Sequence, residues 1–419
     1  MRGTGIRLRY LLHPREEVNR PDLPVLSVYR DHGVVPKDSR SDNFNKTPID
    51  VSRYQVVKAG DLVVNKMKAW QGSIAVSRYS GIVSPDYLVC SVSSDIHGPY
   101  LHYLLRSKPL VAEYGKRSKG IRPAQWRLYW EDLADIGVGL PSLEEQRRIA
   151  SFLDGSVALI DGLISARSSQ RDGVEERFFV EISEMLTPGI VGASGNDRAW
   201  PWLPEFIPGI PMVRLGYLSK LQAGITVHEG RELGGDVVTR PYLRVANVQA
   251  GQVDLSGISE IQVPRAMANR STLRSGDVLM TEGGDLDKLG RGTVWRGEIP
   301  DCLHQNHVFA IRPDRERLDG NYLVLLTQSM HGRCYFESTG SKTTNLASTN
   351  SSKIMKFPIP LRGLDSQRRI VRILNASRET TSRLMRAIDT QLTLLAERKQ
   401  ALITAAVTGQ IDVTTARGV

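Results

Sequence analysis

Two stretches in the first half of the chain are candidates for contacting a nucleic acid. Residues 116–127 (KRSKGIRPAQWR) contain five cations, one amide and one tryptophan but no carboxylate, and residues 65–71 (NKMKAWQ) add two lysines and a glutamine. Lys and Arg neutralise phosphates, and Arg, Lys and Gln can hydrogen-bond the edges of bases. A solvated surface loop is the alternative for 116–127, and a turn is the alternative for 65–71. The candidate contacts here are Lys66, Lys68, Gln71, Lys116, Arg117, Lys119, Arg122, Gln125 and Arg127.

Two polar stretches in the second half occupy the corresponding places but differ in chemistry. Residues 340–353 are rich in hydroxyl and amide side chains, which also contact phosphates and bases. In residues 281–291, a carboxylate such as Glu282 or Asp285 can accept a hydrogen bond from a cytosine amino group. A flexible loop and a turn, respectively, are the alternatives. The dissimilar stretches predict that the two halves read two different sequences. The candidate contacts here are Lys288, Arg291, Lys342, Thr343, Thr344, Asn345 and Asn350.

Motifs for catalysis or cofactor binding are absent from the sequence. It has no GxxxxGK[ST] phosphate loop, no GxGxxG loop opening a helix, no HExxH, and no [DNS]-P-P-[YFW] tetrapeptide of the kind that stacks a flipped base. His304 and His307 lack an acidic or cysteine ligand to complete a metal site, so a polar loop is favoured. Glu397 and Lys399 match the ExK of nucleases but lie in a predicted helix. We predict no catalytic residue, metal ion or cofactor in this chain.

The candidate segments belong to a sequence that repeats itself. The run QRRI occurs at Gln146–Ile149 and again at Gln367–Ile370, and KAGDLV at 58–63 matches RSGDVL at 274–279. Further matches keep the same order along each half of the chain. One duplication followed by small loop insertions produces this pattern.

Each copy begins with a globular part, at 1–140 and at 212–363. Short β-branched runs such as 60–65 and 73–77 alternate with Gly, Pro, Asn and Asp, which is typical of short strands joined by turns. Stretches such as 100–110 are typical of helices. We therefore predict an α+β fold for both globular parts.

A long helix is predicted after each globular part. Apolar residues recur every three or four positions, with Ser142 and Asp365 as candidate caps and Gly409 as a C-terminal stop. Because so narrow an apolar seam needs a partner, we expect the two helices to form an antiparallel coiled coil with a pseudo-two-fold axis. Two separate helices, each packed on its own globular part, are the alternative. The predicted boundaries are 141–186 and 364–413 for the helices, 187–211 for a linker and 414–419 for a tail.

Length and composition fit a cytoplasmic protein of two or three domains. The 419 residues are 41% hydrophobic, which is enough to build real cores. Three cysteines without a CxxC motif argue against a disulfide framework or a cysteine zinc site. No run approaches 18 consecutive apolar residues, and the N-terminal apolar run is too short for a signal peptide. The net charge of +10 fits a polyanionic partner, or simply solubility.

The sequence resembles the specificity subunits of type I restriction–modification systems. Residues 141–154 (PSLEEQRRIASFLD) are similar to the junction of that family, which has a Pro, then Glu-Gln, then Ile-Ala-x-x-Leu. Residues 406–412 (AVTGQID) resemble the family's ending, and Asp31–Gly33 also matches. The second copy departs from the pattern, because residues 365–367 (DSQ) replace the Glu-Gln context and Asn375 replaces the final Asp. The resemblance covers essentially the whole chain.

The resemblance implies two target-recognition domains, at 1–140 and 212–363, held apart by the two long helices. It implies a bipartite, asymmetric target in double-stranded DNA. It also implies that two methyltransferase subunits bind the helices, carrying S-adenosylmethionine, and that restriction subunits using ATP and Mg join them. A specificity subunit with a fused methyltransferase–nuclease partner, a self-contained nuclease and a scaffold that reads no DNA are the alternatives. The candidate partner-binding positions on the helices are Gln146, Ile149, Leu153, Ile160, Gln367, Ile370, Leu374 and Leu384.

Overall fold

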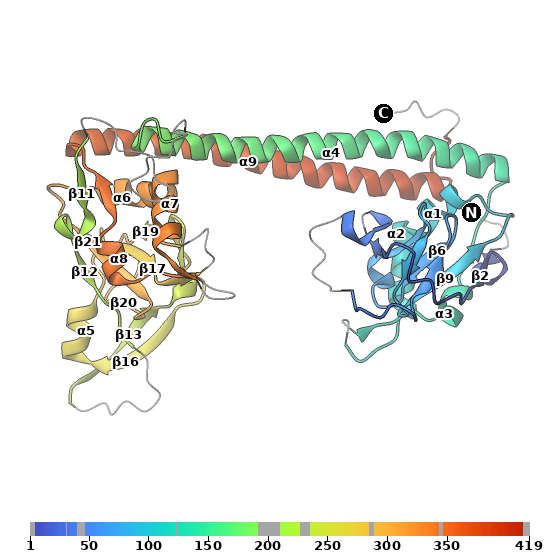
Figure 1. Cartoon of the computed structure of the whole chain (residues 1–419), viewed down its shortest axis with the longest axis horizontal. Helices are drawn as coiled ribbons and strands as arrows, with labels where there is room; N and C mark the ends of the chain where they lie inside the picture. Colours follow the sequence, from blue (N-terminus) through green and yellow to red (C-terminus); the bar gives the residue numbers. More distant parts are fainter. Residues whose placement is uncertain are drawn as a thin grey trace. The chain divides into compact units, whose positions relative to one another are not determined.

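The chain folds into two compact units, one made of 1–168 with 389–419 and the other of 169–388. Each unit combines one globular part with portions of both long helices (Figure 1). The computed structural model describes residues 5–30, 32–39, 47–122, 125–191, 210–226, 235–284, 289–342 and 347–413.

An antiparallel sheet with strand order β2–β9–β6–β7 forms the centre of the first unit. All four residues of β6 are buried, because side chains cover both faces of this strand. The strands are β1 (Ile6–Arg7), β2 (Leu12–Pro14), β3 (Leu26–Tyr29), β4 (Gly33–Pro36), β5 (Gln55–Val57), β6 (Leu62–Asn65), β7 (Ile74–Val76), β8 (Gly81–Val83), β9 (Tyr87–Val92) and β10 (Gly137–Val138). The short α-helices are α1 (Gly98–Leu105), α2 (Lys108–Arg117) and α3 (Trp130–Ala134).

The predicted strands at 60–65 and 73–77 are confirmed as β6 and β7, but the helix at 100–110 is two helices. The chain leaves α1 at Arg106, and α2 starts again after Ser107 with Pro109 in its first turn. Proline lacks the amide hydrogen that a continuing helix needs, yet fits the first turn of a new one. The break turns α2 so that Tyr114 is buried in the core.

A second antiparallel sheet, of order β12–β21–β17–β19, forms the centre of the second unit. A smaller sheet of order β16–β13–β20 lies in the same unit. The strands are β11 (Met212–Arg214), β12 (Ser219–Gln222), β13 (Val237–Leu243), β14 (Val248–Gln249), β15 (Gln252–Val253), β16 (Ser259–Pro264), β17 (Val278–Thr281), β18 (Gly283–Gly284), β19 (Gly292–Val294), β20 (Leu303–His304), β21 (Val308–Pro313), β22 (Ser341–Lys342), β23 (Ala347–Ser348) and β24 (Pro358–Pro360). The short α-helices are α5 (Arg265–Ser271), α6 (Gly320–Gln328), α7 (Met330–Thr339) and α8 (Ser351–Met355).

The matched runs KAGDLV and RSGDVL form the same turn in both units. The buried carboxylates of Asp61 and Asp277 each accept a hydrogen bond of 2.8 Å from the backbone amide three residues upstream. Each carboxylate also binds an arginine, with Arg15 at 3.4 Å in the first unit and Arg312 at 2.7 Å in the second. Because a buried carboxylate needs such partners, the repeated sequence preserves a structural turn rather than a functional site.

The two long helices are α4 (Leu143–Leu186) and α9 (Leu364–Val407), each of 44 residues. Ser142 caps α4, since its Oγ accepts a hydrogen bond of 3.2 Å from the amide of Glu145. Asp365 does not precede α9 as a cap but lies in its first turn, where a carboxylate is favoured by the helix dipole. The helix ends at Val407 rather than at 413, and Gly409 follows with a φ of +68°.

Within each unit, the portions of α4 and α9 run in opposite directions. In the first unit, Leu153 and Ile403 share one core, and Lys399 binds Asp161 at 2.6 Å. In the second unit, Ser377 donates a hydrogen bond of 2.6 Å to Glu181, and the core joins the end of α4 to the start of α9. The helices therefore pack both on each other and on the globular parts.

Candidate nucleic-acid interface

In the first unit, the two cationic stretches lie next to each other. The amide of Leu128 donates a hydrogen bond of 2.9 Å to the carbonyl of Lys66. The rings of Trp70 and Trp126 pack edge to face with centroids 5.4 Å apart, an arrangement that stabilises aromatic pairs. The fold thus brings both candidate stretches to one surface.

A tight hairpin presents the second of these stretches. Backbone hydrogen bonds of 2.9 and 3.0 Å join Lys119 and Arg127 in both directions. A Cβ at Gly120 would lie 2.6 Å from the carbonyl oxygen of Gln125, so only glycine fits here. Ile121 and Arg122 are exposed beyond this contact. We call residues 119–127 the first reading hairpin, of which 123 and 124 lie outside the described residues.

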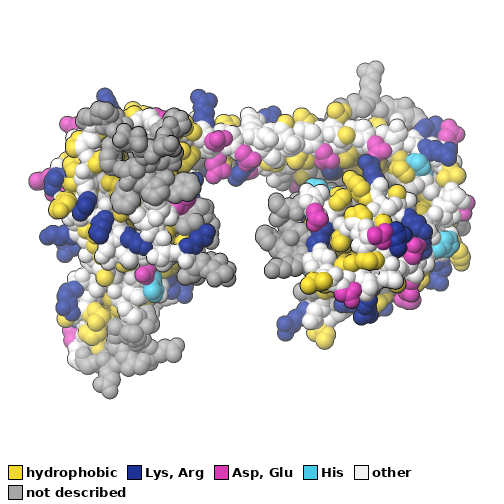
Figure 2. Space-filling view, viewed as in Figure 1, with side chains coloured by type: hydrophobic (Ala, Val, Ile, Leu, Met, Phe, Trp, Pro, Cys, Tyr) yellow, Lys and Arg dark blue, Asp and Glu magenta, His cyan; other side chains and the backbone are white. Residues whose placement is uncertain are grey.

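Carboxylates from elsewhere in the chain accompany the cationic stretch. Lys116 and Arg117 lie in the last turn of α2 rather than in a loop, and both pair with Glu113, at 3.6 and 2.8 Å. Lys119 pairs with Asp132 at 2.9 Å. The absence of acids between 116 and 127 therefore does not make this surface purely cationic. On the face drawn in Figure 2, dark blue and magenta side chains are interspersed over both units.

These ion pairs leave phosphate binding possible. The Lys116 and Lys119 side chains are largely exposed, and exposed ion pairs contribute only about 0–1 kcal/mol. A phosphate can replace such a carboxylate at little cost. Lys68, Gln71, Arg122 and Gln125 are also exposed, whereas Arg127 pairs with Asp86 at 3.5 Å.

The second unit carries an equivalent arrangement with different side chains. Strands β22 and β23 form a hairpin, and β23 also pairs with β18. The amide of Thr349 donates a hydrogen bond of 2.7 Å to the carbonyl of Glu282, as Leu128 does to Lys66. We call residues 341–348 the second reading hairpin. The candidates Thr343, Thr344, Asn345 and Lys288 lie outside the described residues, as does Asp285.

The remaining candidates of the second unit have varied surroundings. Asn350 caps α8, because its Oδ1 accepts a hydrogen bond of 2.9 Å from the amide of Lys353. Lys342 is exposed and Arg291 is partly exposed. Lys353, which the sequence did not single out, donates a hydrogen bond of 2.8 Å to Ser341 of the second reading hairpin.

The two neighbouring histidines have separate roles. His304 is fully buried, and burial lowers the pKa of its imidazole, with Nδ1 lying 2.6 Å from the carbonyl of Val308. His307 is half-exposed and hydrogen-bonds Glu282. Across the parts of the chain that the structure describes, no group of three or more His, Cys, Asp or Glu side chains could hold a metal ion.

Most predicted partner-binding side chains of the long helices are already buried inside their own unit. Leu384, at 43% exposed, is the exception; Gln146, Ile149, Leu153, Ile160, Gln367, Ile370 and Leu374 are at most 8% exposed. Gln146 and Gln367 accept backbone hydrogen bonds from His97 and Asp319, at 2.8 and 2.9 Å. All of these side chains except Ile160 join the helices to the globular parts, through a hydrophobic core or a hydrogen bond to the backbone.

Other apolar side chains of the helices are exposed and were missed by the sequence interpretation. Leu159 and Leu163 on α4 are more than half exposed, as is Leu394 on α9. The predicted seams leave these residues out, because helical periodicity marks one apolar stripe and does not show which apolar residues beside that stripe stay exposed. By length and composition alone α4 is long and apolar enough to cross a membrane. The start of the helix, however, packs into the hydrophobic core of the first unit.

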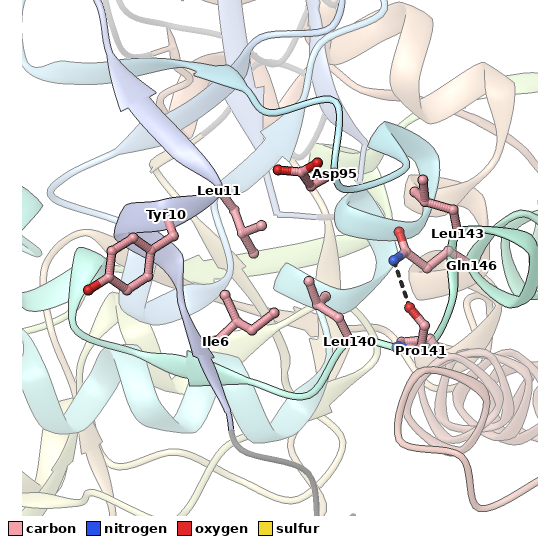
Figure 3. Close-up of a pocket in the computed structure, with 8 residues that line it drawn as sticks. All are labelled: Ile6, Tyr10, Leu11, Asp95, Leu140, Pro141, Leu143 and Gln146. Carbon is pink, nitrogen blue, oxygen red and sulfur yellow. Dashed lines mark hydrogen bonds between the residues drawn. The ribbon is translucent and has the colours of Figure 1, made fainter.

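An open pocket of about 410 Å³ lies where α4 meets the globular part of the first unit (Figure 3). Gln146 is fixed at its edge, donating a hydrogen bond of 3.0 Å to the carbonyl of Pro141. Asp95 is the one lining residue with a carboxylate. This carboxylate accepts a hydrogen bond of 3.0 Å from the hydroxyl of Ser93. The pocket is lined by Ile6, Tyr10, Leu11, Asp95, Leu140, Pro141, Leu143 and Gln146, a set without paired acid–base or nucleophilic groups.

Comparison with known proteins confirms the resemblance seen in the sequence. The Type I restriction enzyme EcoKI specificity subunit of Escherichia coli K12 is 25% identical over 295 residues, covering 67% of this chain and 58% of that protein. The StySPI specificity subunit of Salmonella potsdam is 23% identical over 334 residues, covering 78% and 66%. The chain is therefore similar to type I restriction enzyme specificity subunits, and it spans less than two thirds of the length of these curated relatives.

The fold agrees with this relationship. A solved structure described as the basis of complex assembly and conformational transition of the type I R-M system matches with a TM-score of 0.68. Its sequence is 18% identical, and the match covers 97% of both chains. No protein-family model matches the chain.

Proposed function

We propose that this chain is the DNA-binding specificity subunit of a type I restriction–modification complex. One observation carries the proposal. Each unit attaches a reading hairpin to the corresponding strand end of its own central sheet, yet the side chains at the two hairpins differ. A shared scaffold with dissimilar contact residues is suited to reading two different DNA sequences. The catalytic steps, S-adenosylmethionine, ATP and Mg belong to partner subunits in this proposal, and the complex works in the cytoplasm.

The proposed arrangement makes the target bipartite. Helices α4 and α9 form an antiparallel coiled coil, and the two recognition domains, 1–140 and 212–363, are related by a pseudo-two-fold axis. The opposite directions of α4 and α9 inside each unit support this geometry. The helix pair then sets the spacing of the two half-sites, on the order of one DNA turn or about 34 Å.

The test is to co-express the chain with a methyltransferase subunit from the same genome and to map methylated bases in the host genome. The proposal expects one asymmetric motif of two short blocks separated by a spacer of fixed length. Methylation that appears without this chain, or at a single continuous motif, would contradict it.

We further propose that the exposed leucines of α4 contact the methyltransferase subunit. Burying one leucine contributes about 1.5–3 kcal/mol. The double substitution Leu159→Ser with Leu163→Ser should therefore weaken co-purification of the methyltransferase more than tenfold. Leu255→Ser, an exposed leucine of the second unit outside both long helices, is the matched control. Equal co-purification of both variants would place the docking surface elsewhere.

A further inference from the structure

The end of β6 places a lysine at the base of the first reading hairpin. In the sheet, Asn65 of β6 pairs with Tyr87 of β9, so the next facing positions are Lys66 and Asp86. The carbonyl of Lys66 anchors the hairpin, and its Nζ lies 3.3 Å from the carbonyl oxygen of the residue before Asp86. Asp86 in turn holds Arg127 at 3.5 Å. Two cations therefore converge on this one strand end.

The end of β17 is the equivalent place in the second unit. Thr281 of β17 pairs with Val308 of β21, so the next facing positions are Glu282 and His307. The amide of Glu282 donates a hydrogen bond of 2.9 Å to the carbonyl of His307, and the two side chains bind each other through Oε2 and Nδ1. The carbonyl of Glu282 anchors the second reading hairpin.

The two units therefore carry opposite chemistry at one structural position. Lys66 in the first unit corresponds to Glu282 in the second, and Asp86 corresponds to His307. The backbone is alike at this position, because the strand pairing and the hairpin anchor are the same. Because the fold is kept while the charge is exchanged, the difference belongs to what each unit binds rather than to how each unit folds.

We propose that Lys66 and Glu282 are specificity-determining residues, each reading one base pair; this rests on the function proposed above. Lys66, beside Arg127, donates hydrogen bonds to the acceptors O6 and N7 of a guanine. Glu282 accepts a hydrogen bond from the N4 amino group of a cytosine. A carboxylate has two oxygens, so Glu282 keeps its bond to His307 through Oε2 while its second oxygen accepts from the base.

The half-buried position of Glu282 makes its choice of base selective. Its side chain is 32% exposed and is held by His307, so a base without an amino donor leaves the carboxylate desolvated and poorly paired. Adenine has an amino donor, but its neighbouring N7 acceptor repels the second carboxylate oxygen. Leaving a charged acceptor without its partner is costly in such a site. His307 thus acts as a positioning residue for Glu282.

The experiment is selection of bound duplexes from a pool with a randomised interior, using the full chain with its co-expressed methyltransferase. Glu282→Gln should change the preferred base at one position of one half-site from cytosine to adenine, since Gln pairs with N6 and N7 of adenine. The other half-site and the spacer should stay the same. Glu316→Gln, an exposed carboxylate in a turn of the same unit, is the control and should change nothing.

The substitution Lys66→Glu provides a second, independent test in the first unit. It should convert one guanine preference of the other half-site into a cytosine preference. Circular dichroism of each variant verifies that the fold is retained.

Each outcome of the selection has one meaning. A folded Glu282→Gln variant that selects the unchanged motif, or that loses all preference across its half-site, overturns the proposal. If the unsubstituted chain selects no bipartite motif at all, the function proposed above fails instead.

Discussion

At the scale of single residues, the candidate interface depends on carboxylates that lie outside the cationic stretch itself. The cations of 116–127 pair with Glu113 and Asp132, which flank the stretch, and Arg127 pairs with Asp86. Such exposed pairs are weak, so they orient the cations without preventing phosphate binding. Buried residues behave differently, because a buried polar group must be satisfied inside the protein.

His331 provides a pH test of this difference. Burial lowers the pKa of His331 to about 4, and its Nε2 lies 2.7 Å from the carbonyl of Pro358. The folded state disfavours the charged form of this histidine. Its contribution to the free energy of unfolding is therefore fully present above the unfolded pKa near 6.5, and it is lost as the pH falls towards 4. From this histidine alone, the loss between pH 7 and pH 5 should be roughly 2 kcal/mol. Urea denaturation at several pH values measures it.

The variant His331→Gln keeps a donor for Pro358 but does not titrate. Its free energy of unfolding should depend less on pH than that of the natural chain. The exposed His13→Gln is the control and should keep the natural dependence. If the free energy of unfolding of His331→Gln depended on pH as strongly as that of the natural chain, this histidine would not be the source of the pH dependence.

At the scale of elements, each reading hairpin is attached at its base to the end of a strand in the central sheet of its unit. The first depends on one backbone bond to Lys66, the contact between two tryptophans and the close approach at Gly120. The second depends on its pairing with β18 and the bond from Thr349. Surface elements attached in this way can vary in sequence without disturbing the sheet beneath them.

Gly120→Ala should open the first reading hairpin. The added methyl group meets the carbonyl of Gln125 at 2.6 Å, and overpacking of this kind costs about 1–3 kcal/mol. The near-ultraviolet circular dichroism of Trp70 and Trp126 should change, and affinity for one half-site should fall about tenfold. Gly115→Ala in α2, where no atom lies within 4 Å of the new methyl group, should alter neither signal. Identical spectra and affinities for both variants would contradict the assigned role of this glycine.

At the scale of the whole molecule, the two long helices are parts of both units. Neither unit is complete without a portion of α4 and a portion of α9. Each helix is about 65 Å long at 1.5 Å per residue. A change in helix length should therefore alter the spacing of the half-sites without altering either recognition domain.

Inserting four residues after Arg167 in α4, together with four after Ile388 in α9, tests the spacing function. Four residues make slightly more than one helical turn, so the apolar seam stays nearly in phase while each helix grows by about 6 Å. The methylated motif should keep both blocks and acquire a different spacer. A two-residue insertion at the same places breaks the phase and should weaken folding. A four-residue variant that folds and keeps the original spacer would refute the proposal that the helix pair sets the spacing of the half-sites.

The sequence alone determined the features that are encoded within a few neighbouring residues. The duplication, the strands β6 and β7, the start of α4 at Ser142 and the resemblance to specificity subunits all follow from local patterns. Strand and helix signals reside in periods of two and 3.6 residues, so each is read without knowing the rest of the fold. Pro109 also indicates a break between α1 and α2, because proline favours the first turn of a new helix, although a single helix was predicted there.

Only the tertiary structure decided which side chains face solvent and which segments meet. It buried Gln146 and Leu374 and exposed Leu159 and Leu163. It also set Lys66 opposite Asp86, and Glu282 opposite His307, at the two strand ends. A periodic apolar pattern fixes the presence of a helix but not which of its sides is covered, because covering depends on packing between distant segments. The aligned runs at 58–63 and 274–279 already align Lys66 with Glu282 in the sequence. The correspondence of Asp86 with His307 is visible only when the two sheets are compared pair by pair, since loop insertions shift the numbering between the copies.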